Sequence, residues 1–208
     1  MAKFDDIAPW AMRMLIQDFG FSVADAAAIM GNAGHESGGL VKMQEIKPVV
    51  AGSRGGYGWF QWTGPRRRAF EAYCKRNGYD PASNNANYKF LFIELKSTEK
   101  KAVNATKKAV GLYNKVKAFE LNFERAGVKH YDSRLKWAQR ALAAYEAGAG
   151  KISIPPAPTV VPEAEIRKVE NQGVNDMTRS IITVIIFIAV VAAFFYFTGL
   201  YQKLPFIN

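Results

Sequence analysis

The carboxylate of Glu36 stands at the end of an amphipathic segment, two residues before the glycine pair Gly38 and Gly39. The C-terminal end of a helix disfavours a negative charge and so favours the protonated form of a carboxyl group placed there. A general acid in glycosidic cleavage must hold its proton near neutral pH. The glycines would leave room for a ligand to approach. From position alone, a solvated surface glutamate is the competing interpretation of Glu36.

A second group of candidate residues lies in the stretch GGYGWFQWTG, residues 55–64, which mixes aromatic side chains with glycines. If this stretch forms a short hairpin, side chains alternate between its faces, so Trp59 and Gln61 share one face. Phe60 and Trp62 then share the other face. One face could enter the core, while the other stacks on a sugar ring and bonds its hydroxyl groups. Core packing alone explains the aromatic residues but explains Gln61 less readily.

Mostly helical elements are expected to position these residues. Ser22 followed by Asp25 is a capping box, which predicts a helix that begins there and ends near Glu36, where the glycines interrupt it. Residues 40–64 lose the helical period and predict a loop or small hairpin. Further helices are predicted near the N-terminus, from Thr63 and Pro65 through Tyr73, and over residues 84–97, 99–110, 112–126 and 132–147. The predicted fold class is α+β, mostly α, with one small β-hairpin.

Two motifs in this order resemble a known family. HESGG (35–39) followed by GGYGWFQWTGPRR (55–67) is similar to the phage tail lysozyme family, a branch of the lysozyme-like superfamily. The motifs are also similar to those of goose-type lysozymes and lytic transglycosylases. The resemblance extends over residues 7 to 147, through FELNFERAG (119–127). It implies a lysozyme-like domain that cleaves the β-1,4 bond between N-acetylmuramic acid and N-acetylglucosamine in peptidoglycan.

The resemblance also implies roles for individual residues. Glu36 carries over as the general acid and Gln61 as a residue of the substrate cleft. Trp59 and Tyr57, which flank Gln61 in the aromatic loop, are expected to bind substrate beside it. The segment ALAAYEAGAG (141–150) is similar to an Ala-Tyr-Asn-Ala-Gly segment of lytic transglycosylases, so Tyr145 is a further candidate near Glu36. A helix end before a linker accounts for that segment equally well.

The second carboxylate has two candidates. Glu45 follows Glu36 by nine residues, a separation that resembles the spacing of acid and partner in some phage lysozymes. Glu124, in the FERAG segment, could reach the cleft from another helix or pair with Arg125 or Arg134. If neither serves, a mechanism with a single acid, as in transglycosylases, is favoured. Hydrolysis and transglycosylation both stay open at this point.

Composition limits the other kinds of site. The single cysteine, Cys74, excludes an internal disulfide and is expected to be a buried structural thiol. With two histidines, His35 and His130, a histidine-rich metal site is not expected, and no metal or cofactor is predicted. His35 is expected to be exposed at its helix end or to tune Glu36. Residues 1–150 hold 23 basic and 14 acidic residues, which favours a polyanionic partner.

The C-terminal part predicts a membrane anchor. Residues 181–201 carry no charge, and 21 residues of helix span roughly the 30 Å of a bilayer core. Four prolines precede this stretch and suit an extended spacer. We therefore predict a catalytic domain at 1–150, a Pro-rich and polar linker at 151–178, a transmembrane anchor at 179–203 and a short tail at 204–208. The lipid membrane is the predicted partner of residues 181–201.

Charge around the span predicts where the domain lies. Arg167, Lys168 and Arg179 precede the span and Lys203 follows it, so the positive-inside tendency leaves the domain on the side where it is made. In a cell that side holds no murein. We therefore expect a phage virion with an internal membrane to carry the enzyme to the host wall. The host inner membrane, with a role in host lysis, is the alternative.

Three classes of function remain open from the sequence. The first is a membrane-anchored enzyme that degrades peptidoglycan, with other virion membrane or capsid proteins as further candidate partners. The second is a wall-binding module without turnover. The third is a basic, membrane-tethered nucleic-acid binder, which would leave HESGG and GWFQW without a role and has no recognisable nucleic-acid motif. No specific nucleic-acid partner is predicted.

Overall fold

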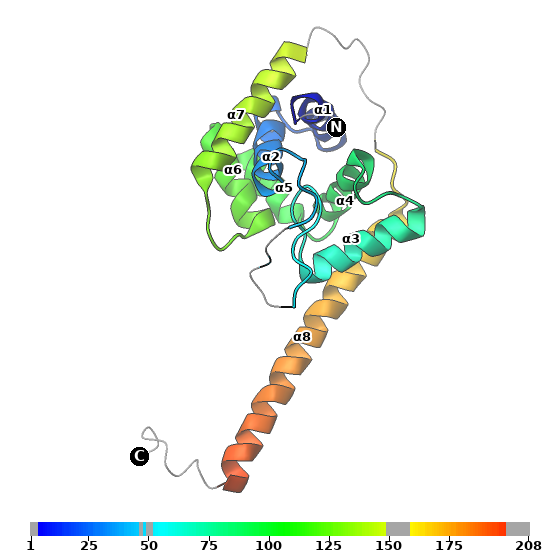
Figure 1. Ribbon diagram of the computed structural model, residues 1–208, viewed down its shortest axis with the longest axis vertical. Coiled ribbons are helices and arrows are strands. Elements are labelled where there is room, and N and C mark those ends of the chain that lie inside the picture. Colours follow the sequence, from blue (N-terminus) through cyan, green and yellow to red (C-terminus); the bar gives the residue numbers. More distant parts are fainter. Residues whose placement is uncertain (1–3, 46–47, 49–51, 149–158, 199–208) are drawn as a thin grey trace. The chain divides into compact units, whose positions relative to one another are not determined.

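The computed structural model describes residues 4–45, 48, 52–148 and 159–198 and divides the chain into two compact units. The first unit extends to Glu170 and the second begins at Asn171. The helices of the first unit, in chain order, are α1 (Phe4–Phe19), α2 (Val23–Glu36), α3 (Gly64–Asn77), α4 (Asn84–Lys96), α5 (Lys100–Lys108), α6 (Leu112–Phe119), the π-helical turn η1 (Glu120–Glu124) and α7 (Tyr131–Gly148). The last helix, α8 (Glu163–Thr198), runs from the first unit into the second (Figure 1).

Helix α2 is the centre of the first unit. The predicted capping box starts it, because the Ser22 hydroxyl accepts from the Asp25 amide while the Asp25 carboxylate accepts from the Ser22 amide at 2.8 Å. Half of its 14 residues are alanine or glycine, and the helix is buried from Asp25 to Gly34. These small side chains allow α1, α6 and α7 to pack closely around it (Figure 1). The core of the domain therefore surrounds the helix that ends in Glu36.

The predicted helices are confirmed with small changes at their ends. The helix after Thr63 continues to Asn77, and the helices predicted at 84–97, 99–110 and 132–147 correspond to α4, α5 and α7. The helix predicted at 112–126 is confirmed only to Phe119, because the backbone changes to a π-helical turn over Glu120–Glu124. That turn widens the helix by one residue and re-aims the side chains that follow.

Of the loop or small hairpin predicted at 40–64, the described residues form the loop, and no strand of a hairpin is found among them. Two isolated bridges, Gln44 with Tyr57 and Tyr57 with Trp62, are present instead. Tyr57 and Trp62 exchange both backbone hydrogen bonds, and the chain turns between them with left-handed φ angles of 82° at Gly58 and 45° at Gln61. The alternation of faces is also absent, because Trp59, Phe60 and Trp62 are all buried. The described domain is therefore helical, with a tightly folded aromatic loop in place of the β element.

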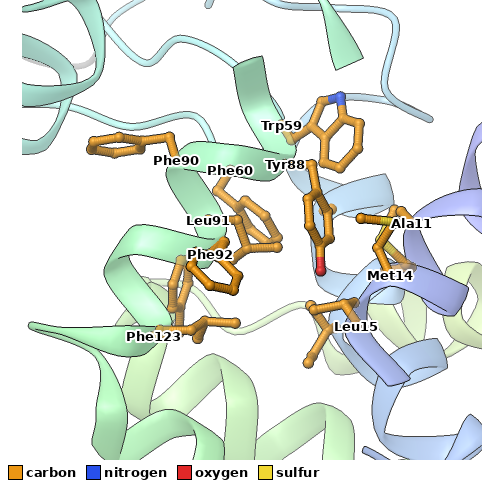
Figure 2. Close-up of a cluster of buried hydrophobic side chains, with 14 of the residues drawn as sticks. Ala11, Met14, Leu15, Trp59, Phe60, Tyr88, Phe90, Leu91, Phe92 and Phe123 are labelled. Atoms are coloured by element: carbon orange, nitrogen blue, oxygen red, sulfur yellow. The ribbon is translucent and has the colours of Figure 1, made fainter. Parts of the chain in front are cut away.

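The aromatic loop is part of the main core. Figure 2 shows Trp59 and Phe60 among side chains from α1 and α4, with Phe123 of η1 in the same cluster. Phe60 and Phe123 meet edge to face with ring centres 5.0 Å apart. Burial of these large rings is the main stabilising contribution expected for such a cluster. The loop is thereby fixed to the same core that holds α2.

The start of α8 belongs to the first unit. Val169 is buried in its core, and Glu165 accepts from Nη2 of Arg76 at 2.9 Å. Helical residues that pack on the domain therefore lie within the segment 151–178 that was predicted as linker. Residues 151–158 of that segment lie outside the described residues, as do 199–208, which include the predicted tail.

The described part of the second unit is the remainder of α8, which is apolar and mostly exposed from Ile181 to Phe194. Ile185, Phe187 and Ile188 are among its side chains that are more than half exposed. Within the described residues, α8 is the one helix long and apolar enough to cross a membrane. Length and composition alone support that statement.

Candidate active site

Glu36 ends α2 in an ion pair with α7. Its Oε1 atom accepts from Nη2 of Arg134 at 2.5 Å. The Arg134 side chain is 1% exposed and that of Glu36 is 20% exposed. The chain then turns through Gly38 and Gly39, which both have left-handed φ angles of 58° and 83°. The carboxylate is therefore held from inside while one edge of it faces solvent.

The remaining donors of Arg134 fix its position. Nη1 donates to Oδ1 of Asn32 at 3.0 Å, and Nε donates to the Lys129 carbonyl at 2.8 Å. Asn32, also buried, donates to the carbonyls of Ala28 and Val116. Residues of α2, α6 and α7 thus form one hydrogen-bonded network beneath Glu36. Such a network orients the carboxylate before any ligand binds.

Glu124 is the candidate for a second carboxyl group. The π-helical turn places it at the end of η1, and Arg125 stops the turn with a left-handed φ of 54°. Its Oε1 atom is buried and has no hydrogen-bond partner among the described residues. Burial raises the pKa of Glu124 well above its ordinary value, and the nearby charge of Glu36 raises it further, against Arg66 and Arg134. Glu124 therefore retains its proton where an ordinary glutamate is ionised.

Arg66 does not neutralise Glu124, because Arg66 is already paired. Its Nε and Nη2 atoms donate to the two carboxylate oxygens of Glu94 at 2.7 and 2.8 Å, a bidentate pair. The Trp62 indole also donates to Glu94, at 2.8 Å. The buried Glu94 thus accepts hydrogen bonds from Arg66 of α3 and from the Trp62 indole of the aromatic loop. This leaves one ion-paired carboxylate, Glu36, and one carboxyl that holds its proton, Glu124.

His35 is half-buried beside Glu36, which corrects the expectation of an exposed histidine. Its Nδ1 atom lies 2.9 Å from Oγ of Ser133, and its ring centre is 5.4 Å from that of His130. Burial lowers the pKa of His35 to about 4, and the charges of Arg134 and His130 act in the same direction. His35 is therefore neutral at neutral pH, and its contact with Ser133 holds the ring next to Glu36.

Glu45 holds the aromatic loop. Its Oε2 atom accepts from the Gly56 amide at 2.7 Å, and its own amide donates to the Gly56 carbonyl at 2.9 Å. Gly55 packs against the same carboxylate. These contacts explain Glu45 structurally, and the carboxyl group whose pKa is affected by Glu36 is Glu124.

Trp59 lies in the core, where the prediction had placed it in the substrate cleft. Its side chain is 0% exposed, and its amide donates to Asn87 at 2.9 Å. Gln61 is part-exposed, but its amide group donates to the carbonyls of Lys42, Met43 and Gly58. Gln61 therefore ties the turn after Glu36 to the aromatic loop. Trp59 is too deeply buried for a sugar ring to stack on it.

Tyr57 and Tyr145 are both apart from the Glu36 network. Tyr57 is part-buried and makes both bridges of the loop, with the guanidinium of Arg67 5.2 Å from its ring centre. Tyr145 packs on the core from the far part of α7. At 1.5 Å per residue, the helix rises about 16 Å between Arg134 and Tyr145. The structure does not bring Tyr145 to the glutamate.

The sequence did not predict that Arg134 and Asn32 lie together beneath Glu36. Arg134 was named only as a partner for Glu124. The signal for its burial was its place on one face of α7 with the buried Ala138 and Ala141, four and seven residues on.

Cys74 is buried as predicted, and burial raises its pKa to about 12. Within the described ranges, no three His, Cys, Asp or Glu side chains are grouped to hold a metal ion.

Glu36 at the end of the central helix and Glu124 at the end of η1 interact electrostatically, and two carboxyl groups are the chemistry that glycoside-cleaving enzymes use. Comparison with protein families matches residues 6–145 to the family described as phage tail lysozyme. Comparisons with curated proteins and with solved structures gave no match. The chain belongs to the phage tail lysozyme family. This membership supports a lysozyme-like function in peptidoglycan degradation.

Proposed function

We propose that this protein hydrolyses the β-1,4 bond between N-acetylmuramic acid and N-acetylglucosamine, with Glu36 and Glu124 as its two carboxyl groups. The observation that carries the proposal is their contrast: Glu36 is ion-paired to Arg134, while Oε1 of Glu124 is buried with no hydrogen-bond partner among the described residues and the nearby Arg66 is paired with Glu94. Two carboxyl groups whose environments favour different protonation states are the arrangement expected for acid and base roles. Family membership supplies the substrate class.

In this proposal Glu36 meets the glycan, and its part-exposed carboxylate beside the glycine turn supports that role. A bound glycan removes water from Glu36 and weakens the solvation of its charge, so the proton of the pair passes to Glu36. Glu36 then gives this proton to the glycosidic oxygen as the bond from that oxygen to the sugar C1 breaks. Glu124, now ionised, stabilises the positive charge that develops at C1.

A water molecule completes the reaction. Its oxygen adds to C1, and one of its protons returns to the carboxyl pair, which restores the resting state. Arg134 keeps the carboxylate of Glu36 in position through both steps. The presence of a second carboxyl group favours this hydrolytic sequence over a mechanism with a single acid.

Product analysis tests the proposal. Full-length protein in detergent is incubated with purified murein sacculi, and the released muropeptides are separated and weighed by mass spectrometry. Hydrolysis yields products with reducing N-acetylmuramic acid ends. Products with 1,6-anhydro ends would show that the reaction is transglycosylation and not hydrolysis. The absence of released muropeptides would contradict glycan cleavage altogether.

We further propose that α8 anchors the enzyme in a phage virion membrane. Its exposed apolar side chains between Ile181 and Phe194 support this, as does the family's phage origin. Replacing Ile185 and Ile188 together by Asp should abolish flotation of the full-length protein with liposomes, because charge at mid-bilayer is costly. Val110→Asp, at an exposed position of the first unit, is the control and should float normally.

The virion location needs its own test. Purified virions should contain this chain in their lipid fraction and should lyse sacculi after mild disruption. Detection only in the membranes of infected cells would assign the protein to host lysis instead.

A further inference from the structure

An open hollow of about 570 Å³ lies on the first unit between α6 and the start of α7. Its lining residues are Tyr113, His130, Tyr131, Asp132, Ser133 and Lys136. Its volume is within the range of small-molecule sites. None of these residues was a candidate for substrate binding in the sequence, and the reaction proposed above does not use them.

The lining combines aromatic rings with mixed polar groups. Tyr113 and Tyr131 meet edge to face with ring centres 6.2 Å apart, and the Tyr113 side chain is among the exposed large side chains of the domain. Ser133 and the imidazole of His130 both donate and accept hydrogen bonds. Asp132 and Lys136 carry opposite charges, and the ammonium of Lys117 lies 5.4 and 5.5 Å from the ring centres of Tyr113 and Tyr131. Apolar faces with donors and acceptors suit an amide-bearing sugar.

The Tyr131 ring of the hollow is held in place by a buried carboxylate. The Tyr131 hydroxyl donates to Oε2 of Glu120 at 3.1 Å, and Glu120 is completely buried. Glu120 also accepts from the Ala126 amide and from Lys129 at 2.9 and 3.0 Å. A ring fixed in this way loses little conformational freedom when a ligand stacks on it. Tyr131 is therefore held in position by hydrogen bonds to the domain beneath the hollow.

One wall of the hollow contacts the residue next to Glu36. Ser133 lies 2.9 Å from His35, and the His130 ring is 5.4 Å from the His35 ring. Ser133 also directly precedes Arg134, which donates to Glu36. The hollow therefore lies beside the residue that directly precedes Glu36.

From these contacts we infer that the hollow is a saccharide subsite, which holds an N-acetylhexosamine unit of the strand one or more units away from the bond that is cleaved. This inference rests on the proposed function for its substrate class. It replaces Trp59, which is buried, by Tyr113 and Tyr131 as the aromatic residues that contact sugar.

The experiment compares wild type with Tyr113→Ala in the full-length protein in detergent. On soluble murein glycan strands, Tyr113→Ala should raise KM roughly tenfold, the loss expected for one contact of about 1.4 kcal/mol, and leave kcat within about twofold. Val110→Ala, at another exposed position close to α6, is the control and should leave both constants unchanged. An unchanged KM in Tyr113→Ala, with active wild type, would overturn the subsite.

A binding measurement separates this inference from the proposed function. Wild type and Tyr113→Ala are titrated with chitotetraose, a soluble oligomer of N-acetylglucosamine, and followed by calorimetry. Weaker binding to Tyr113→Ala supports the subsite even if wild type cleaves no murein, in which case only the proposed function fails. Equal binding by the two proteins, or no binding by either, contradicts the subsite.

Discussion

Arg134 of α7 donates to Glu36 of α2 across 2.5 Å, although the two residues are 98 positions apart in the chain. This contact joins the end of the central helix to the helix that packs most extensively on it. It holds the carboxylate that the family resemblance assigns as the general acid. The proposed mechanism therefore depends on a tertiary contact, and each test below changes one part of it.

Loss of the buried guanidinium should destabilise the fold. Arg134→Met leaves Glu36 and Asn32 without their partner, and removal of one member of a buried pair costs about 3–5 kcal/mol. Urea unfolding of the full-length protein in detergent measures this loss. Arg140→Met removes an exposed pair with Asp5 and should cost only about 0–1 kcal/mol. Equal losses in the two variants would mean that the Arg134 network contributes little.

Glu124→Gln should change how stability depends on pH. Because the pKa of Glu124 is raised in the folded state, that state holds a proton which the unfolded chain releases above about pH 4.5. Folding stability therefore falls as pH rises from 4.5 to the raised pKa. The variant lacks this fall, so its urea midpoint should drop less than that of wild type between pH 4.5 and pH 8.

Glu71→Gln is the control with the opposite sign. Burial opposes ionisation of Glu71, but hydrogen bonds from Arg54 and Arg67 outweigh it and lower its pKa. Its ionised form therefore stabilises the fold above the unfolded pKa, and this contribution is lost as pH falls. Glu71→Gln should lower the midpoint at pH 8 more than at pH 4. A Glu124→Gln variant that behaves like Glu71→Gln would contradict the raised pKa of Glu124.

The close contact of α2 with α7 predicts a strong effect at Gly31. A Cβ atom there would lie 2.5 Å from Cβ of Ala138 and 2.7 Å from backbone atoms of α7. Gly31→Ala should therefore destabilise the fold by about 1–3 kcal/mol through overpacking. Gly148→Ala, at the open end of α7, meets nothing within 4 Å and should be neutral or slightly stabilising. Thermal unfolding of both variants checks the difference.

Much of the fold could be predicted because its signals are local. Ser22 and Asp25 are three residues apart and cap α2 by themselves, and Gly38 and Gly39 end it. The aromatic loop could not be predicted in this way. Its conformation depends on partners far along the chain, such as Asn87, which accepts from the Trp59 amide. A short mixed run of glycines and aromatic residues fits a hairpin equally well until those partners are known.

The helix end that carries Glu36 could be predicted for the same reason, while its role as general acid follows from the family resemblance and stays a prediction. Glu124 was one of two candidates for a second carboxyl group. The choice between Glu45 and Glu124 needs tertiary contacts, because Glu45 bonds to the loop amide of Gly56 while Glu124 is brought into the field of Glu36. The π-helical turn that re-aims Glu124 has no local sequence signal that we could recognise.

The burial of Trp59 gives a prediction that separates core from cleft. Trp59→Ala should cost about 3–5 kcal/mol, as expected for a large aromatic side chain removed from a core. Activity should fall only in proportion to the folded fraction, measured on the same sample by unfolding and by murein turnover. A stable Trp59→Ala protein without activity would instead return Trp59 to the substrate cleft.

The release of muropeptides by Glu36→Gln in the full-length protein tests the central claim most directly. The amide keeps the shape of the carboxylate and accepts from Arg134, but it cannot donate the proton that the glycosidic oxygen needs. We expect release at least about a hundredfold below wild type, with chitotetraose still bound and a cooperative unfolding transition retained. A folded Glu36→Gln protein that releases muropeptides at close to the wild-type rate would contradict the assignment of Glu36 as the proton donor.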